Sequence, residues 1–300
     1  MTVPVTGDNP YYGNAALSAP LCSKPRPLFL SMTTVKLCAL CGREKPLRDS
    51  HFIPKHVYRR LAAMASRESA GLMMNSGGAA FKLGRQITQY LLCACCETRF
   101  SKNGEDYFAD VAMQRPGQIP PVLLRVLSVN LNPFRHRIPY RRFSFGSGLF
   151  DGEGGKGIDS RSIYYFAISL FWRGGLDGWR FHQKVEYEDG LLDAMGRFLL
   201  GGGYVSGYIV RVIPSIFHYK WGFVLPNFRK GVPFFNIGSF DFYLERRSSR
   251  TLMRGAPFDV PIFYTIDIVE SISSHLEMTG AIRSAKKTKA LDGKDDLISW

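Results

Sequence analysis

The most informative part of the sequence lies in three short stretches: LCALCG at residues 37–42, DSHFIPK at residues 49–55, and LLCACCE at residues 91–97. Cys38 and Cys41 form one C-x-x-C pair, and Cys93 and Cys96 form a second. Each pair places two sulfur ligands on one turn, so two pairs complete the tetrahedral shell of a structural Zn²⁺ ion. Cys95 competes for the second pair, but its spacing from Cys93 is wrong for such a turn. The alternative is four buried thiols without a metal.

The positive charge of the chain is concentrated in its first half. The net charge of the 300 residues is +14, and residues 1–150 hold 20 Lys and Arg against 8 Asp and Glu. Residues 151–300 hold 19 against 17, so the excess accompanies the cysteine pairs. A basic half favours a polyanionic partner, nucleic acid before an anionic membrane surface. A protein that is merely basic is the alternative.

Composition and patterning indicate a folded protein outside the membrane. Hydrophobic residues make up 45% of the chain, which supports a sizeable core. No run approaches the roughly 18 to 20 apolar residues of a membrane span, and residues 1–30 show no signal-peptide pattern. Paired cysteines of this kind are typical of metal ligands in a reducing compartment. We therefore expect a cytoplasmic protein.

The punctuation by proline and glycine predicts an α+β protein in several segments. Residues 1–31 are predicted to be a flexible arm, and residues 116–160 a Pro/Gly-rich basic connector. Residues 32–115 carry the cysteine pairs, and the 51 residues between the pairs demand a helical and loop insertion. Helical spacing predicts a helix from Lys55, and the Gly-rich residues 71–84 are predicted to be a loop.

The second half is predicted to be a mixed α+β domain at residues 161–282, followed by a charged tail at 283–300. Residues 163–172 and 191–200 are predicted as helices, the first of them buried, and Gly201 ends the second. Aromatic and β-branched runs predict strands at 204–213, 217–225, 234–244 and 258–268. No residue of this half carries a motif that assigns it a function.

The spacing of the cysteines and His51 resembles the zinc-bearing branch of the HNH endonuclease family. The resemblance covers roughly residues 35–110, and it is closer still to a group of uncharacterised bacterial HNH-like proteins. Those share a Ser-His-x-Ile-Pro-Lys segment, here beginning at Ser50, and a Leu-Leu-Cys-x-x-Cys-Glu-x-x-Phe-Ser segment, here beginning at Leu91. The resemblance implies a zinc-stapled ββα finger of the treble-clef type, and metal-dependent hydrolysis of phosphodiester bonds in DNA, or in RNA.

The resemblance also implies roles for individual residues. His51 would be the general base that activates water, and Glu97, just after the last cysteine, would bind a catalytic Mg²⁺ or Mn²⁺ ion. The family often has an acid directly before the histidine, where this chain has Ser50. Asp49 is the substitute, because alternate residues of a strand point to one face. The alternative for His51 is a structural histidine, and for Glu97 an exposed carboxylate at a helix N-terminus.

Two further features bear on this hypothesis. The asparagine expected a few residues before Cys93 is replaced by Thr88 and Gln89, so the loop after His51 is held either by one of these or differently. Basic residues near the motif are candidates for phosphate contacts, with a solvated basic face as the alternative: Lys55, Arg59, Arg60, Arg99 and Lys102. Rival functions are an inactive zinc module that binds nucleic acid and a protein-interaction scaffold.

Overall fold

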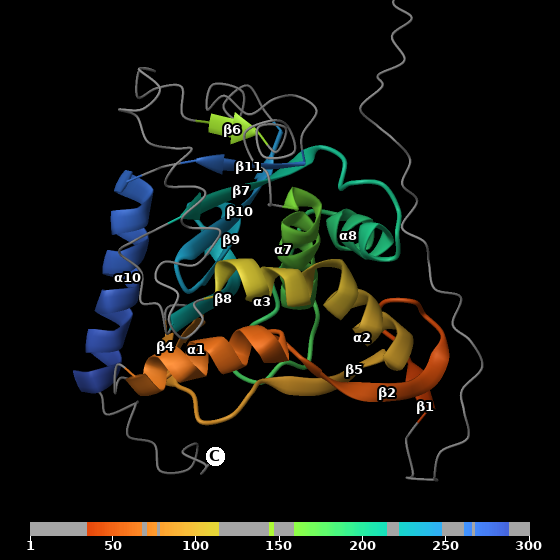
Figure 1. Ribbon diagram of the computed structural model, residues 1–300, viewed down its shortest axis with the longest axis horizontal. Coiled ribbons are helices and arrows are strands. Elements are labelled where there is room, and N and C mark those ends of the chain that lie inside the picture. Colours follow the sequence, from red (N-terminus) through yellow and green to blue (C-terminus); the bar gives the residue numbers. More distant parts are fainter. Residues whose placement is uncertain are drawn as a thin grey trace, which may run out of the picture.

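A computed structural model describes residues 35–67, 71–76, 79–113, 144–146, 159–214, 222–247, 261–265 and 268–287 (Figure 1). The helices are α1 (Lys55–Arg67), α2 (Ala94–Phe100), the π-helix η1 (Ser101–Glu105), α3 (Asp106–Ala112), α7 (Ser160–Gly174), α8 (Leu191–Leu199) and α10 (Ile268–Lys287). The predicted arm at 1–31 and most of the connector at 116–160 lie outside the described residues. The mixture of helices and strands confirms the α+β class.

The strands form two sheets. The smaller sheet has the order β1-β2-β5 and joins β1 (Val35–Leu37), β2 (Glu44–His51) and β5 (Thr88–Cys93). The larger has the order β4-β3-β8-β9-β10-β7-β11-β6. Its members are β3 (Met73–Ser76), β4 (Ala79–Lys82), β6 (Ser144–Gly146), β7 (Tyr208–Pro214), β8 (Gly222–Arg229), β9 (Val232–Ile237), β10 (Phe240–Arg246) and β11 (Ile262–Thr265).

The prediction of a loop at residues 71–84 is wrong, because this insertion contains the hairpin β3–β4. Strand β3 runs parallel to β8, with Met74 opposite Phe223, so the insertion belongs to the same sheet as the second half of the chain. Met73 and Met74 are both buried there. The many small polar residues of the insertion are typical of a loop, so its local sequence did not predict a strand. Strand β3 forms because it pairs with β8, far along the chain.

Helix α7 passes through the middle of the molecule (Figure 1) and is almost entirely buried, as its apolar sequence predicted. Its N-cap is Asp159, whose Oδ1 accepts hydrogen bonds from the backbone N–H groups of Arg161 and Ser162 at 3.0 and 3.1 Å. Helix α8 ends before Gly201, which has a φ of 106°, as predicted from the glycine run. Both helical predictions are confirmed.

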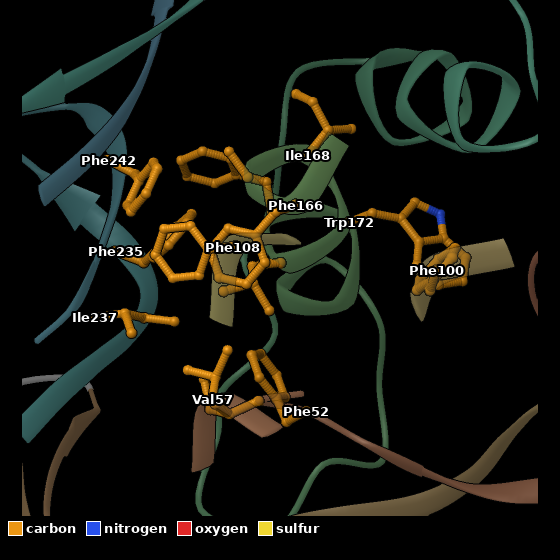
Figure 2. Close-up of a cluster of buried hydrophobic side chains, with 14 of the residues drawn as sticks. Phe52, Val57, Phe100, Phe108, Phe166, Ile168, Trp172, Phe235, Ile237 and Phe242 are labelled. Carbon is orange, nitrogen blue, oxygen red and sulfur yellow. The ribbon is translucent and has the colours of Figure 1, made fainter. Parts of the chain in front are cut away.

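Aromatic rings join α7 to the large sheet and to α2 and α3 in one continuous core (Figure 2). Phe108 of α3 stacks on Phe166 of α7 with ring centroids 3.7 Å apart, and Phe235 and Phe242 of the large sheet lie against this pair. Trp172 of α7 packs edge-on against Phe100, at the end of α2. The segment that carries the cysteines is thereby fixed to α7.

The C-terminal part differs from the prediction in two places. The strand predicted at residues 234–244 is the hairpin β9–β10, with Gly238 at its turn and a φ of 55°. Helix α10 reaches Lys287, five residues into the predicted tail, and packs Met278 and Ile282 onto the face of the large sheet opposite to α7. Residues 288–300 lie outside the described residues. In the described ranges, no helix has both the length and the apolar character that crossing a membrane requires.

Candidate metal centre and adjoining cleft

The four predicted cysteines meet at the end of the small sheet. Their sulfur atoms all lie within 4.8 Å of one another, with Cys41 Sγ and Cys93 Sγ 4.0 Å apart. Sulfurs around a tetrahedral Zn²⁺ with Zn–S bonds of about 2.3 Å are separated by about 3.8 Å. The arrangement is therefore compatible with a structural metal such as zinc. Cys95 is exposed and lies outside the group.

The turn after β1 presents the first cysteine pair. The N–H of Gly42 donates to the Cys38 carbonyl at 2.9 Å, and Gly42 has a φ of 65°, which glycine adopts without strain. The backbone N–H of Cys93 donates to Cys38 Sγ at 3.3 Å, which links the turn to the end of β5. Cys96 follows in the first turn of α2. Strand, turn and helix thus each place a ligand.

The crowding of the thiols shifts their acidity in opposite directions. A hydrogen bond with the Cys96 side chain lowers the pKa of Cys38 to about 4. The same hydrogen bond, together with burial, raises the pKa of Cys96. Ionisation of one thiol is thus favoured. Ionisation of a second is opposed by repulsion between the thiolates unless a bound cation neutralises their charge.

A cavity of about 430 Å³ lies beside the cysteine group, and none of the four cysteines lines it. His51 and Asp49 of β2 line it, together with Glu97 of α2. The three residues singled out as the base and as ligands of a catalytic ion therefore share one cleft. Its remaining lining residues come from the strand, helix termini and helices around it: Arg48, Pro54, Lys55, His56, Ala94, Thr98, Ser101, Glu105, Asp106 and Arg173.

The position of Ser50 explains how Asp49 and His51 come to share this cleft. Ser50 is fully buried on the opposite face of β2, where its Oγ accepts a hydrogen bond from the Leu92 N–H at 3.1 Å. It also donates to the Arg48 carbonyl at 3.3 Å, next to a bulge between Arg48 and Asp49. As the alternation of a strand predicts, the residues on either side of Ser50 both face the cleft.

The loop after His51 is held through the backbone. The N–H of Phe52 donates to the Ile87 carbonyl at 2.9 Å, and the Phe52 ring is buried against Trp179 with centroids 4.8 Å apart. Gln89 instead donates through Nε2 to the Asp177 carbonyl at 3.2 Å, which ties β5 to the segment after α7. The loop is thus not held by a side-chain amide, as the family resemblance implies, but by the backbone hydrogen bond of Phe52.

The electrostatics of the cleft centre on His51, which is half-buried. Burial lowers the pKa of His51, and the nearby charges of Lys55 and Arg173 add to this effect. The carboxylates of Asp49 and Glu97 oppose it. The imidazole is therefore neutral at neutral pH, and one of its ring nitrogens is able to accept a proton.

Glu97 carries an unsatisfied oxygen. Its Oε1 is buried and accepts no hydrogen bond from the described residues. Glu97 itself lines the cleft. Among the described residues, the cysteines are the one group of three or more side chains placed to hold a metal. Asp49, His51 and Glu97 share the cleft without closing into such a group.

Sequence reasoning missed Arg173 and Glu105. Arg173 lies near the end of α7, and its Nη2 donates to Glu105 Oε1 at 2.6 Å. Both side chains are buried and both line the cleft. Burial raises the pKa of Glu105, and the charge of Arg173 opposes that rise. The available signal was a single arginine at the end of the apolar run that starts at Ile163.

The predicted basic residues do not form one surface. Lys55 lines the cleft, whereas Arg59 and Lys102 are exposed and do not line it. Arg60 pairs with Asp110 at 3.6 Å, and Arg99 donates to the Leu200 carbonyl at 3.0 Å. The cleft itself is mixed in charge, since both basic and acidic side chains line it.

Comparisons with protein families, with curated proteins and with solved structures found no match to this chain.

Proposed function

We propose that the protein is a metal-dependent endonuclease that hydrolyses phosphodiester bonds of DNA, or of RNA. The observation that supports this most is the meeting of His51, Asp49 and Glu97 in one cleft beside the cysteine group. A base and two hard oxygen donors around a cavity are what water attack on a phosphodiester requires.

In this proposal Cys38, Cys41, Cys93 and Cys96 bind a structural Zn²⁺ ion away from the reaction. The ion joins the turn after β1 to the end of β5 and the start of α2. Glu97 lies on α2, and β2, which carries Asp49 and His51, follows that turn and pairs with β5. The metal therefore acts on activity through the folding of the site, because the free energy of zinc binding is folding free energy.

Glu97 and Asp49 are the proposed ligands of a catalytic Mg²⁺ or Mn²⁺ ion. The buried, unsatisfied Oε1 of Glu97 fits an oxygen-seeking cation. Two protein ligands are sufficient, since Mg²⁺ usually keeps several waters and takes further oxygens from substrate phosphates. Such an ion supplies charge neutralisation at the phosphate and at the leaving oxygen.

His51 is the proposed general base. It stands at the end of β2, where Ser50 anchors the strand to the core and Phe52 fixes the loop that follows. The imidazole is thus held on the cleft wall by neighbours on both sides. In this proposal it accepts the proton of the attacking water, while Lys55, the first residue of α1, contacts a phosphate.

A cleavage assay tests the proposal. Wild type, His51→Ala and His56→Ala are incubated with plasmid DNA and with RNA in the presence of Mg²⁺ or Mn²⁺. His56 lines the same cleft but pairs with Asp106 at 3.0 Å, so it serves as the matched histidine control. We expect loss of cleavage in His51→Ala and retained cleavage in His56→Ala. Equal activity of wild type and His51→Ala would remove His51 from the mechanism.

A zinc module that binds nucleic acid without cleaving it is the second candidate. Within the described ranges, the side chains of the cleft form no ready-made group of three metal ligands, and this favours the second candidate. The same assay separates the two, provided that binding is measured in parallel. Binding without cleavage under every metal condition would identify the non-catalytic module.

A further inference from the structure

Arg173 has an unusual place for a charged side chain. It is 1% exposed, yet it lines the cleft, and among the described residues it is the one lining residue from the second half of the chain. Its guanidinium lies 4.7 Å from the centroid of the Phe100 ring. A buried guanidinium on the wall of a cavity is positioned to meet whatever enters that cavity.

The hydrogen bonds of Arg173 leave its Nε without a partner among the described residues. Nη2 donates to Glu105, and Nη1 donates to Ser169 Oγ at 3.3 Å. Nε is buried and bonds to no acceptor in the described part of the chain. A buried donor without a partner is costly, so a ligand that supplies an acceptor gains free energy from it.

A second buried pair in the same chain provides the contrast. Arg211 pairs with Glu245 at 2.6 Å and also lies over an aromatic ring, that of Tyr243. There, however, Nε itself donates to the carboxylate, and neither residue lines the cleft. The Arg211 pair has the geometry of a structural contact, whereas the Arg173 pair leaves Nε for another partner.

We propose that Arg173 is a buried phosphate-binding residue of the cleft, held in place by Glu105. This inference rests on the proposed function, because it identifies how the phosphate of the substrate is recognised. Guanidinium groups bind phosphate oxygens through directed N–H donors, and burial strengthens that interaction. The unsatisfied oxygen of Glu97 on the same cavity disfavours a bare carboxylate ligand and suits a phosphate accompanied by a divalent cation.

The pairing with Glu105 gives Arg173 a fixed orientation. Glu105 ends the π-helix η1, and Gly104 beside it packs so closely on α7 that a Cβ there would lie 2.6 Å from the Ser162 carbonyl oxygen. The carboxylate is therefore anchored to the helix that carries Arg173. Since π-helical turns are frequent at functional sites, this irregularity is consistent with a positioning role for Glu105.

Binding of inorganic phosphate tests the inference without relying on hydrolysis. Titration calorimetry with Mg²⁺ compares wild type, Arg173→Lys and Arg211→Lys, with thermal unfolding as the check on folding. Lysine keeps the charge beside Glu105 but lacks the Nε donor. We expect saturable binding by wild type, weakening by roughly tenfold or more in Arg173→Lys, and no change in Arg211→Lys. Equal affinity in Arg173→Lys, or no saturable binding by wild type, would overturn the inference.

Two further variants keep the test decisive. If Arg173→Lys does not fold, the double variant Arg173→Gln with Glu105→Gln removes both charges together, and unchanged phosphate affinity in it would overturn the inference. His51→Ala separates the two proposals, because it is expected to keep phosphate binding while losing cleavage. Phosphate binding that depends on Arg173 in a protein without nuclease activity would refute the proposed function alone.

Discussion

The backbone N–H of Leu92 donates a hydrogen bond of 3.1 Å to the Oγ of Ser50 at the centre of the small sheet. The resemblance to the HNH family implies an acid at this position, but the Ser50 side chain is fully buried beside a bulge in β2. A hydroxyl fits this place because it both donates and accepts. The serine therefore has a structural role, and Asp49 is the acidic residue of β2 that faces the cleft.

Introducing the acid of the family at this position is expected to destabilise the protein. Ser50→Asp places a carboxylate in the core without a cationic partner, and we expect a loss of about 3 kcal/mol or more. Ser50→Ala leaves the Leu92 N–H unsatisfied and is expected to cost about 1 to 3 kcal/mol. Urea unfolding of the three proteins measures both effects. A Ser50→Asp protein as stable as wild type would contradict the burial described for this site.

Removal of the structural metal is expected to unfold the N-terminal part of the protein. Elemental analysis should find zinc bound in wild type, and Cys38→Ser or Cys96→Ser should lower both the zinc content and the melting temperature, because metal binding supplies folding free energy. Cys95→Ser is the matched control and should retain zinc, since Cys95 lies outside the group. Zinc loss in Cys95→Ser, with retention in Cys96→Ser, would assign the ligands differently.

Gly104→Ala is expected to weaken the contact between η1 and α7. The new Cβ would lie 2.6 Å from the Ser162 carbonyl oxygen and 2.7 Å from the Phe166 nitrogen, so the helices must separate. We expect a loss of about 1 to 3 kcal/mol in the free energy of unfolding. Gly280→Ala on α10 meets no atom within 4 Å and should be neutral or stabilising by up to about 1 kcal/mol. Comparable effects of the two substitutions would argue against the close packing.

Substitution of basic residues should separate nucleic-acid contacts from structural ones. Lys55→Ala, in the cleft, is expected to weaken oligonucleotide binding and to reduce the slope of log affinity against log salt by about 1. Arg99→Ala should instead reduce stability, by roughly 1 kcal/mol, because Arg99 donates to the Leu200 carbonyl. Fluorescence anisotropy over a salt series measures the slopes. Identical slopes for wild type and Lys55→Ala would exclude a phosphate contact by this lysine.

Local sequence patterns predicted much of the geometry of the candidate site. The C-x-x-C spacing identified the four cysteines that meet, because a turn of fixed geometry brings both sulfurs of a pair together. The alternation of a strand placed Asp49 and His51 on one face, and the apolar run of residues 163–172 predicted the buried helix α7. In each case a few adjacent residues contain the whole geometric relationship.

Only the tertiary structure could show which distant segments meet. The β3–β8 pair, the hydrogen bond from Gln89 to the Asp177 carbonyl, and the placement of Arg173 beside Glu105 join residues far apart in the sequence. Such contacts arise because each element buries its apolar face against whichever partner completes the core, and no local period encodes that choice. Local patterns in the sequence were enough to predict which four cysteines meet and that the residues flanking Ser50 share one face. The three-dimensional packing decided that a buried arginine from the second half of the chain completes their cleft.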